Sequence, residues 1–261
     1  MIRQYPLTPS VGKRLIAKAL TRHPLVTQAL RNGRLVIVAG TTNGYVAEEI
    51  LAHIGQSVGF SRRHFFRGIT IPPARITGSS RRFADNSGFP GDVVIDKGVW
   101  KRAKTIFEVA DTLGADDLIL KGANALDVVS GHAANFVDHS DAGPMAVVLP
   151  AVLGRRAKLI IPVGLEKRVT GSLLNLANRL SMSDVKGPRL CPLPGEVFTE
   201  IDAILLATGA RATLVGAGGV GGAEGCVWLA VEGNDDQLSE VETLMRKIHA
   251  EPAFLVETES P

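Results

Sequence analysis

A short loop of small and polar residues, Gly40-Thr41-Thr42-Asn43, directly follows the apolar run 34–39. The residues after it, 45–54, have a helical pattern, so the loop lies at a predicted helix N-terminus. Backbone N–H groups and hydroxyls in such a position can hold a phosphate group. The loop is therefore a candidate phosphate cradle, while an ordinary N-cap and tight turn is the alternative reading.

A second candidate loop begins with Lys121, which follows the apolar run 118–120 and precedes Gly122, Asn124 and Asp127. A lysine at the end of an apolar strand loses hydration unless an anion or a carboxylate meets it. We therefore predict that Lys121 pairs with an anion or polarises a carbonyl group. Gly122 and Asn124 are predicted to contribute to ligand binding, and Asp127 is a candidate for moving a proton.

A third loop follows the apolar run 158–162 and contains Glu166, Lys167 and Arg168. Acidic and basic residues directly after a strand suit an anion clamp or a catalytic carboxylate, and a solvated polar loop is the alternative. Glu166 is thus a second candidate for proton transfer, and Lys167 is a predicted ligand-binding residue. The later segment 194–200 offers Glu196 and Glu200, although glutamates near a helix start are also favoured by the helix dipole alone.

The segment 131–141 combines glycine with residues that can carry protons or bind metal: His132, Asp138, His139 and Asp141. Most such pairs in a glycine-containing loop are solvated, so we predict no metal site here. Cys191 and Cys226 lie far apart in apolar surroundings and have no metal-ligand spacing, which indicates two reduced core residues. No cofactor is predicted.

The elements that must position these loops alternate along the chain. Buried strands are predicted at 34–39, 92–96, 117–121 and 158–162 and helices at 11–30, 45–54, 99–113, 146–153 and 171–180; the segment 194–200 is predicted to lead into a last helix that continues through 206. Apolar strands that alternate with helices predict an α/β fold, with a mostly parallel sheet and helices on both faces. In such a sheet, ligands bind beyond the carboxyl ends of the strands, where all three candidate loops lie.

The C-terminal part has a different pattern, with strands predicted at 212–215, 226–231 and 253–257 and an amphipathic helix at 235–249. This ββαβ order predicts a small α+β appendage. We therefore expect an α/β domain over residues 1–210 with an N-terminal helical arm, and a segment over 211–261 that is either separate or integrated into the same domain.

The glycine-rich run 215–225, VGAGGVGGAEG, contains a match to G-x-G-x-x-G over Gly216–Gly221. In a dinucleotide-binding fold these glycines turn a strand into a helix. Here the run leads into CVWLAV, whose β-branched and aromatic residues favour a strand. A glycine-rich hairpin loop is the favoured interpretation, and an NAD(P)-dependent oxidoreductase is kept as an alternative.

The chain has 261 residues, of which 45% are hydrophobic, and a net charge of +3. No apolar run approaches the length of a membrane span, and the first residues lack the apolar stretch of a signal peptide, so a cytoplasmic protein with no membrane partner is expected. Six arginines and no acid lie between residues 53 and 84: Arg62, Arg63, Arg67, Arg75, Arg81 and Arg82. Proline and glycine interrupt this segment, so nucleic acid is a less favoured partner than an anionic small molecule or a second copy of the chain.

Three of these motifs together resemble the superfamily that includes ribose-5-phosphate isomerases, glucosamine-6-phosphate deaminases, CoA transferases and sugar-phosphate-sensing regulators. Gly40-Thr41-Thr42-Asn43 is similar to its phosphate loop, Gly114-Ala-Asp-Asp117 to its aspartate segment, and Lys121-Gly-Ala-Asn-Ala-Leu126 to its lysine segment. The chain departs from the superfamily because its aspartate and lysine segments share one strand. Asp116 and Lys121 should then lie at opposite ends of that strand. The catalytic glutamate of the isomerases has no clear counterpart here, and Asp127 is only a candidate for it.

The resemblance implies the α/β fold and a phosphorylated or CoA-like anionic ligand, with an isomerase or a transferase as the activity if the protein is an enzyme. A non-catalytic metabolite sensor that uses the same cleft is the alternative from another class. Its regulation would have to act through a partner, since no helix-turn-helix pattern is found.

Overall fold

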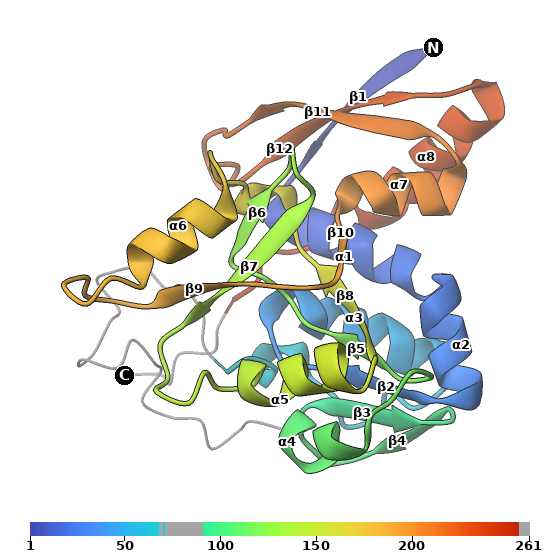
Figure 1. Cartoon of the computed structure of the whole chain (residues 1–261). Helices are drawn as coiled ribbons and strands as arrows, with labels where there is room; N and C mark the ends of the chain where they lie inside the picture. Colours follow the sequence, from blue (N-terminus) through green and yellow to red (C-terminus); the bar gives the residue numbers. More distant parts are fainter. Residues whose placement is uncertain (68–69, 71–90, 256–261) are drawn as a thin grey trace, which may run out of the picture.

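The structure is a computed structural model that describes residues 1–67, 70 and 91–255 of the chain. In this part of the chain the strands form three sheets. A central sheet of six strands carries the three candidate loops, and two antiparallel sheets of three strands each lie beside it (Figure 1). The arginines Arg75, Arg81 and Arg82 of the basic segment lie outside the described residues.

The central sheet has the strand order β10-β8-β5-β2-β3-β4. Its strands are β2 (Arg34–Ile37), β3 (Val93–Asp96), β4 (Val99–Lys101), β5 (Leu118–Leu120), β8 (Lys158–Pro162) and β10 (Glu196–Phe198). The first four strands of this order are parallel, while β3 and β4 run antiparallel to their neighbours. Because helices cover the faces of β5 and β2, β5 is apolar and buried throughout, and β2 is apolar and buried after its first residue, Arg34. The predicted α/β class with a mostly parallel sheet is therefore confirmed.

Helices α1 (Pro9–Leu20) and α3 (Thr41–His53) pack together on one side of this sheet, and α4 (Ile106–Val109) and α5 (Met145–Leu149) lie on the other side (Figure 1). The remaining helices are α2 (Pro24–Asn32), α6 (Leu173–Leu180), α7 (Glu200–Thr208) and α8 (Asp235–Ile248). Helix α1 contacts α3, α7 and α8, so it lies between the central sheet and the C-terminal elements.

The N-terminal helical pattern forms two helices that are packed into the core instead of one projecting arm. Pro24 cannot continue a helix, and the chain bends at Thr21–His23 between α1 and α2. Leu15, Ile16 and Leu20 of α1 are fully buried. The apolar face of α1 is thus covered by α3 and α7.

The predicted helix over 99–113 is also wrong in its first half. Strand β4 follows β3 through the two residues Lys97 and Gly98, both of which have positive φ. This conformation matches the right-handed twist of a tight hairpin. Only the short helix α4 and one 3-10 turn, Ala110–Thr112, remain of the expected helix.

A second sheet, β6-β7-β9, was not predicted from the sequence. It consists of β6 (Ala125–Asp127), β7 (His132–Val137) and β9 (Arg189–Pro192), all antiparallel. Strand β7 occupies most of the segment 131–141 that was expected to be a loop. Its partner β9 lies more than fifty residues further along the chain, so local sequence patterns could not reveal the pairing.

The third sheet has the order β1-β12-β11 and includes the N-terminal strand β1 (Ile2–Leu7) beside β12 (Val227–Glu232) and β11 (Arg211–Ala217). The expected strands at 212–215 and 226–231 and the helix α8 are therefore present. In place of the expected last strand, residues 253–255 form no regular structure, and 256–257 lie outside the described residues. The third strand comes instead from the opposite end of the chain.

The segment 194–200, predicted to lead into a helix through 206, forms β10 before α7 begins at Glu200. Thr199 ends the strand and caps the helix, since its hydroxyl and backbone N–H both bond to the carboxylate of Asp202. This capping box starts α7 at Glu200. The division places Glu200 at the carboxyl edge of the central sheet.

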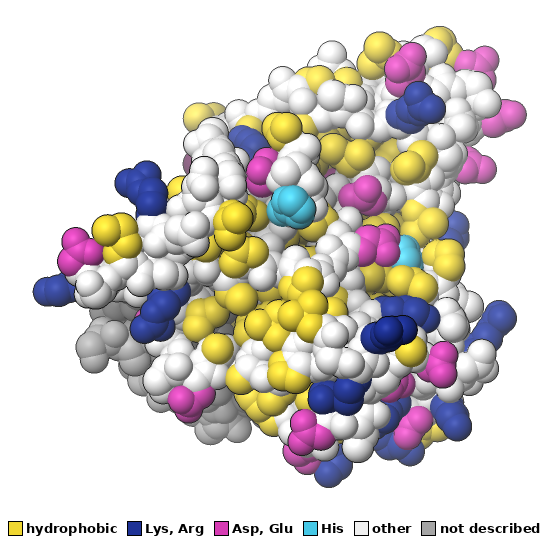
Figure 2. All heavy atoms as spheres, in the orientation of Figure 1, with side chains coloured by type: hydrophobic (Ala, Val, Ile, Leu, Met, Phe, Trp, Pro, Cys, Tyr) yellow, Lys and Arg dark blue, Asp and Glu magenta, His cyan; other side chains and the backbone are white. Residues whose placement is uncertain are grey.

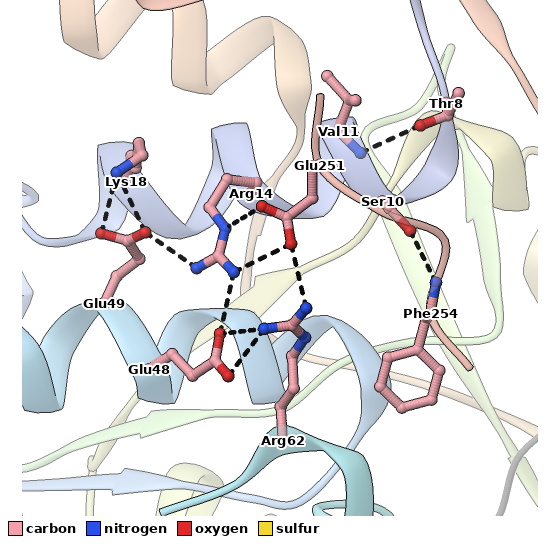
Figure 3. A network of polar contacts seen from close by, with 10 residues as sticks. All are labelled: Thr8, Ser10, Val11, Arg14, Lys18, Glu48, Glu49, Arg62, Glu251 and Phe254. Carbon is pink, nitrogen blue, oxygen red and sulfur yellow. Dashed lines mark hydrogen bonds and ion pairs between the residues drawn. The ribbon is translucent and has the colours of Figure 1, made fainter. Parts of the chain in front are cut away.

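A network of charged side chains ties the C-terminal segment to α1 and α3 (Figure 3). Arg14 bonds to Glu251, Glu48 and Glu49 at 2.8–2.9 Å, and Arg62 bonds to Glu48 and Glu251. Beyond Glu251, the backbone N–H of Phe254 donates to the hydroxyl of Ser10 at 3.1 Å (Figure 3). The C-terminal segment is thus held on the layer formed by α1 and α3.

Hydrophobic side chains gather on one face of the molecule over α5, as Figure 2 shows. Residues 144–154, which form α5 and the wider turn after it, contain no charged or polar side chain. None of the helices in the described ranges has the length and apolar character needed to cross a membrane.

Candidate functional site

The carboxyl ends of β2, β5, β8 and β10 meet along one edge of the central sheet, which we call the carboxyl edge. The residues that follow these strands are Val38, Lys121, Val163 and Thr199. Strand β3 runs in the opposite direction, so the residue before it, Asp92, lies on the same edge. The structure therefore brings the three predicted loops together and adds Asp92 to them.

The predicted phosphate cradle has two parts: Thr42 and Asn43 are buried, whereas Gly40 and Thr41 are partly exposed. Asn43 is fully buried, and its amide donates to the backbone carbonyls of Val38 at 2.7 Å and Leu120 at 3.0 Å. It thus ties β2 to β5 and does not face a ligand. Thr42 is buried as well, and its hydroxyl has no hydrogen-bond partner among the described residues.

Gly40 and Thr41 form the open half of the loop. No side chain caps the N-terminus of α3, which leaves the N–H groups of its first turn available to solvent or to a ligand. A Cβ atom added at Gly40 would meet no atom within 4 Å. The protein itself therefore does not require a glycine at this position.

Lys121 lies at the centre of the carboxyl edge. Its backbone N–H donates to the carbonyl of Ile160 at 3.1 Å, which continues the ladder between β5 and β8. Its ammonium group makes one long contact, 3.5 Å to the carbonyl of Gly122, and no ion pair with any carboxylate in the described ranges. Burial lowers the pKa of Lys121 to about 8, and the neighbouring Lys167 adds to this effect.

Two further cations accompany Lys121. Lys167, in the 3-10 turn Leu165–Lys167 after β8, donates to the carbonyl of Ala123 at 2.7 Å, and burial also lowers its pKa. Arg67 lies close enough to Lys121 to affect its charge. Two lysines with lowered pKa values at one strand edge mark this edge as a candidate functional site.

Asp92 is the carboxylate whose charge affects Lys121 most among the described residues, and it was not a predicted site residue. Its side chain is 0% exposed, pairs with Arg67, and accepts the backbone N–H groups of Ala39 at 2.8 Å and Ile106 at 2.7 Å. Asp92 thereby anchors Arg67 to the carboxyl edge. The sequence does show an acid, Asp92, directly before an apolar strand. However, the antiparallel direction of β3 decides at which edge of the sheet this acid lies.

The loop after Lys121 is mainly structural. Asn124 accepts the side-chain amide of Asn135 at 3.1 Å and the backbone N–H of Phe136 at 3.0 Å, which holds β7 in place. A Cβ atom added at Gly122 would lie 3.7 Å from the carbonyl of Pro162, an ordinary contact. The structure thus gives the predicted ligand-binding residue Asn124 a role in joining the two sheets.

Asp127 lies in the turn between β6 and β7. It accepts the hydroxyl of Ser130 at 2.6 Å and the N–H groups of Val129 and Ser130 at 3.1 and 3.3 Å. The hydrogen bond from the Ser130 hydroxyl lowers the pKa of Asp127. A carboxylate held ionised by three donors is poorly suited to take up a proton.

Glu166 borders a groove of about 520 Å³. The groove is lined by residues of the β6–β7 turn, of the loop after β8 and of β11, which include Asp127, Arg168, Thr170 and Leu214. The carboxylate of Glu166 forms an ion pair of 3.3 Å with Lys13 of α1. Asp127 and Glu166 are the two candidates for proton transfer. Of these, Glu166 pairs with a buried lysine and also borders the groove.

Glu200 lies behind Glu166 and is 1% exposed. It accepts the backbone N–H of Leu165 at 2.9 Å. Burial raises the pKa of Glu200 to about 8, with a further contribution from the charge of Glu166. The sequence analysis named Glu200 but attributed it to the helix dipole, which would lower its pKa.

The aspartates 116 and 117 lie at the amino end of β5, away from Lys121, as their spacing predicted. Asp117 accepts the backbone N–H groups of Arg34 at 2.7 Å and Gly114 at 2.8 Å. It therefore fixes the start of β2 against β5.

The glycine-rich run forms the hairpin loop between the antiparallel strands β11 and β12. The N–H of Gly218 donates to the carbonyl of Cys226 at 2.8 Å, and Glu224 turns back onto the N–H of Gly222. Since the run joins two strands, it does not present a helix N-terminus to a pyrophosphate.

The histidines of 131–141 do not form a metal centre. His139 accepts the N–H of Asp141 at 3.1 Å, and both side chains are largely exposed. Throughout the described ranges, no three histidine, cysteine or acidic side chains are close enough to bind one metal ion. Cys226 is buried as expected, whereas Cys191 is only half-buried and lies near Lys121.

Comparisons of this chain with protein-family models, with curated proteins and with solved structures find no match.

Proposed function

We propose that this protein binds a phosphorylated or CoA-like anionic metabolite at the carboxyl edge, as an isomerase or transferase of the suspected superfamily would. The single observation that carries the proposal is the ammonium group of Lys121, which lies partly buried at the end of β5 and forms no ion pair with a carboxylate among the described residues. Desolvation of an unpaired ammonium is costly, and an anionic ligand would offset that cost.

The neighbours of Lys121 support an anion of more than one negative charge. Lys167 adds positive charge beside Lys121, whereas the nearby Arg67 is paired with Asp92. The uncapped first turn of α3, at Gly40 and Thr41, follows the adjacent strand β2 and supplies N–H donors. A phosphate group suits this combination of cations and backbone donors.

Glu166 is the proposed proton carrier. It adjoins Lys167 in the chain and borders the groove. Its carboxylate is paired with Lys13 and has access to a bound molecule, whereas the oxygens of Asp127 accept three local hydrogen bonds. Proton transfer at a carbon or oxygen next to a polarised carbonyl is the chemistry that this arrangement supports.

The experiment is a thermal-shift screen followed by calorimetry with inorganic phosphate, sugar phosphates, CoA and NAD(P)H. A ligand that binds only the folded state raises its stability by mass action. We expect phosphate-containing compounds to stabilise the wild type and not Lys121→Met. Lys101→Met, which removes an exposed lysine from β4 of the same sheet, is the matched control and should respond as the wild type does.

Two results would contradict the proposal. Equal stabilisation of the wild type and Lys121→Met would show that the anion binds elsewhere than at the end of β5. Stabilisation by NAD(P)H alone, lost when the hairpin loop 216–221 is shortened, would favour the oxidoreductase alternative instead.

A further inference from the structure

Glu200 is a buried acid that takes no part in the proposed anion site. It is the first residue of α7, where the N–H groups of the helix would favour a charged carboxylate. One of its oxygens accepts the N–H of Leu165, and the other is packed against Gly12 of α1. A Cβ atom at Gly12 would overlap with Oε1 of Glu200 and lie 3.2 Å from its Cδ.

The charged groups around Glu200 come from three elements. Lys13 lies on α1, Glu166 and Lys167 lie in the turn after β8, and Glu200 begins α7. The ammonium group of Lys13 pairs with Glu166 at 3.3 Å. Lys167 is directed to the carbonyl of Ala123 at 2.7 Å. Glu200 itself has no ion pair within the described part of the chain, and it accepts a hydrogen bond from a backbone N–H.

Two carboxyl groups in one desolvated cluster oppose each other's ionisation. Lys13 pairs with Glu166 and not with Glu200. Glu200 is the more deeply buried member, with 1% of its surface exposed against 16% of the Glu166 side chain. Desolvation without an ion pair therefore favours the protonated form of Glu200, while Glu166 borders the groove.

We propose that Glu200 holds a proton at neutral pH and acts as the positioning partner of Glu166, because its carboxyl group accepts the N–H of Leu165, the residue directly before Glu166. Glu166 is the member that borders the groove, and Glu200 acts through it as a positioning residue. The use of this pair in acid–base catalysis rests on the proposed function, whereas the proton on Glu200 is a property of the free protein.

The test is a pH titration of the ligand-free protein labelled with ¹³C at the glutamate carboxyl carbon, followed by NMR. We expect one glutamate resonance to titrate above about pH 6, well over the ordinary value of about 4.3. That transition should be absent in Glu200→Gln, and in Glu166→Gln its midpoint should fall because the repelling charge is gone. Glu240→Gln, at an exposed position of α8, is the control and should leave the transition unchanged.

Each outcome decides the proposal. Absence of any glutamate transition above about pH 6 would overturn it, as would a transition that persists in Glu200→Gln. A midpoint unaffected by Glu166→Gln would show a buried acid with no coupling to the groove, and would likewise overturn it. If Glu200→Gln does not fold, the wild-type and Glu166→Gln titrations still decide. Because no ligand is added, failure of phosphate binding leaves this result unaffected.

Discussion

The side-chain amide of Asn43 spans β2 and β5, and donates to the carbonyl of Leu120 at 3.0 Å while it also bonds to Val38 at 2.7 Å. Asn43 thus bonds to the residue directly before Lys121, because Leu120 is the last residue of β5. A residue that resembled a phosphate ligand in the sequence instead holds together the strand ends that carry the candidate site.

Asn43→Ala should therefore destabilise the fold. The change removes two buried hydrogen bonds and leaves two strand-end carbonyls without a side-chain donor, so we expect a loss of about 2–4 kcal/mol in the free energy of unfolding. Urea denaturation measures it. Thr41→Ala, two residues earlier on the same turn, should change stability by less than about 1 kcal/mol. Equal effects of the two changes would show that Asn43 has no special structural role.

Lys121→Met should make the protein more stable while it abolishes phosphate binding. Burial lowers the pKa of Lys121 from its ordinary value of 10.5 to about 8, so the fold disfavours the ammonium form. The penalty is complete below about pH 8 and disappears as the pH rises through 10.5. At pH 7 we expect a gain of about 1–3 kcal/mol, which should shrink between pH 8 and 10.

Urea denaturation at pH 7 and pH 10 checks this expectation, with Lys101→Met as the exposed control. A loss of stability in Lys121→Met at pH 7 would indicate that the ammonium group is already well paired in the free protein. That outcome would remove the main support for an anion site.

Gly12→Ala should destabilise the protein although alanine is the better helix former. In an open helix the change would gain roughly 1 kcal/mol. Here the added Cβ would overlap with the carboxylate of Glu200, so we expect a net loss of about 1–3 kcal/mol.

The double variant Gly12→Ala/Glu200→Ala distinguishes the cause. Once the carboxylate is removed, the alanine at position 12 should become neutral or stabilising relative to Glu200→Ala alone. Additive losses in this double-mutant cycle would mean that Gly12 and Glu200 do not contact each other as described.

Glu251→Gln should loosen the C-terminal segment. It weakens the ion pairs to Arg14 and Arg62, although both arginines keep Glu48 as a partner (Figure 3). We expect a loss of about 1–2 kcal/mol and faster hydrogen exchange at the Phe254 N–H, which bonds to Ser10. Glu240→Gln on the exposed face of α8 is the control. Unchanged exchange at Phe254 would show that the charge network does not hold this segment.

Much of the central sheet could be predicted from the sequence, because its signals are local. The continuous apolar runs at 35–37, 118–120 and 159–161 indicate strands that are buried on both faces, and the polar loops after them indicate the binding edge. The position of Lys121 at that edge and of Asp117 at the other follows from the length of one strand. These features depend only on neighbours in the chain.

The remaining features depend on which distant segments pair, and only the tertiary structure decides that. The pairing of β1 with β12 and of β7 with β9 joins residues that are far apart in sequence. The direction of β3 places Asp92 beside Arg67, and the packing of α1 against α7 places Gly12 beside Glu200. Local periodicity predicts whether a segment is buried. The partner, its direction and the charges that meet in the core result from competition among contacts across the whole chain.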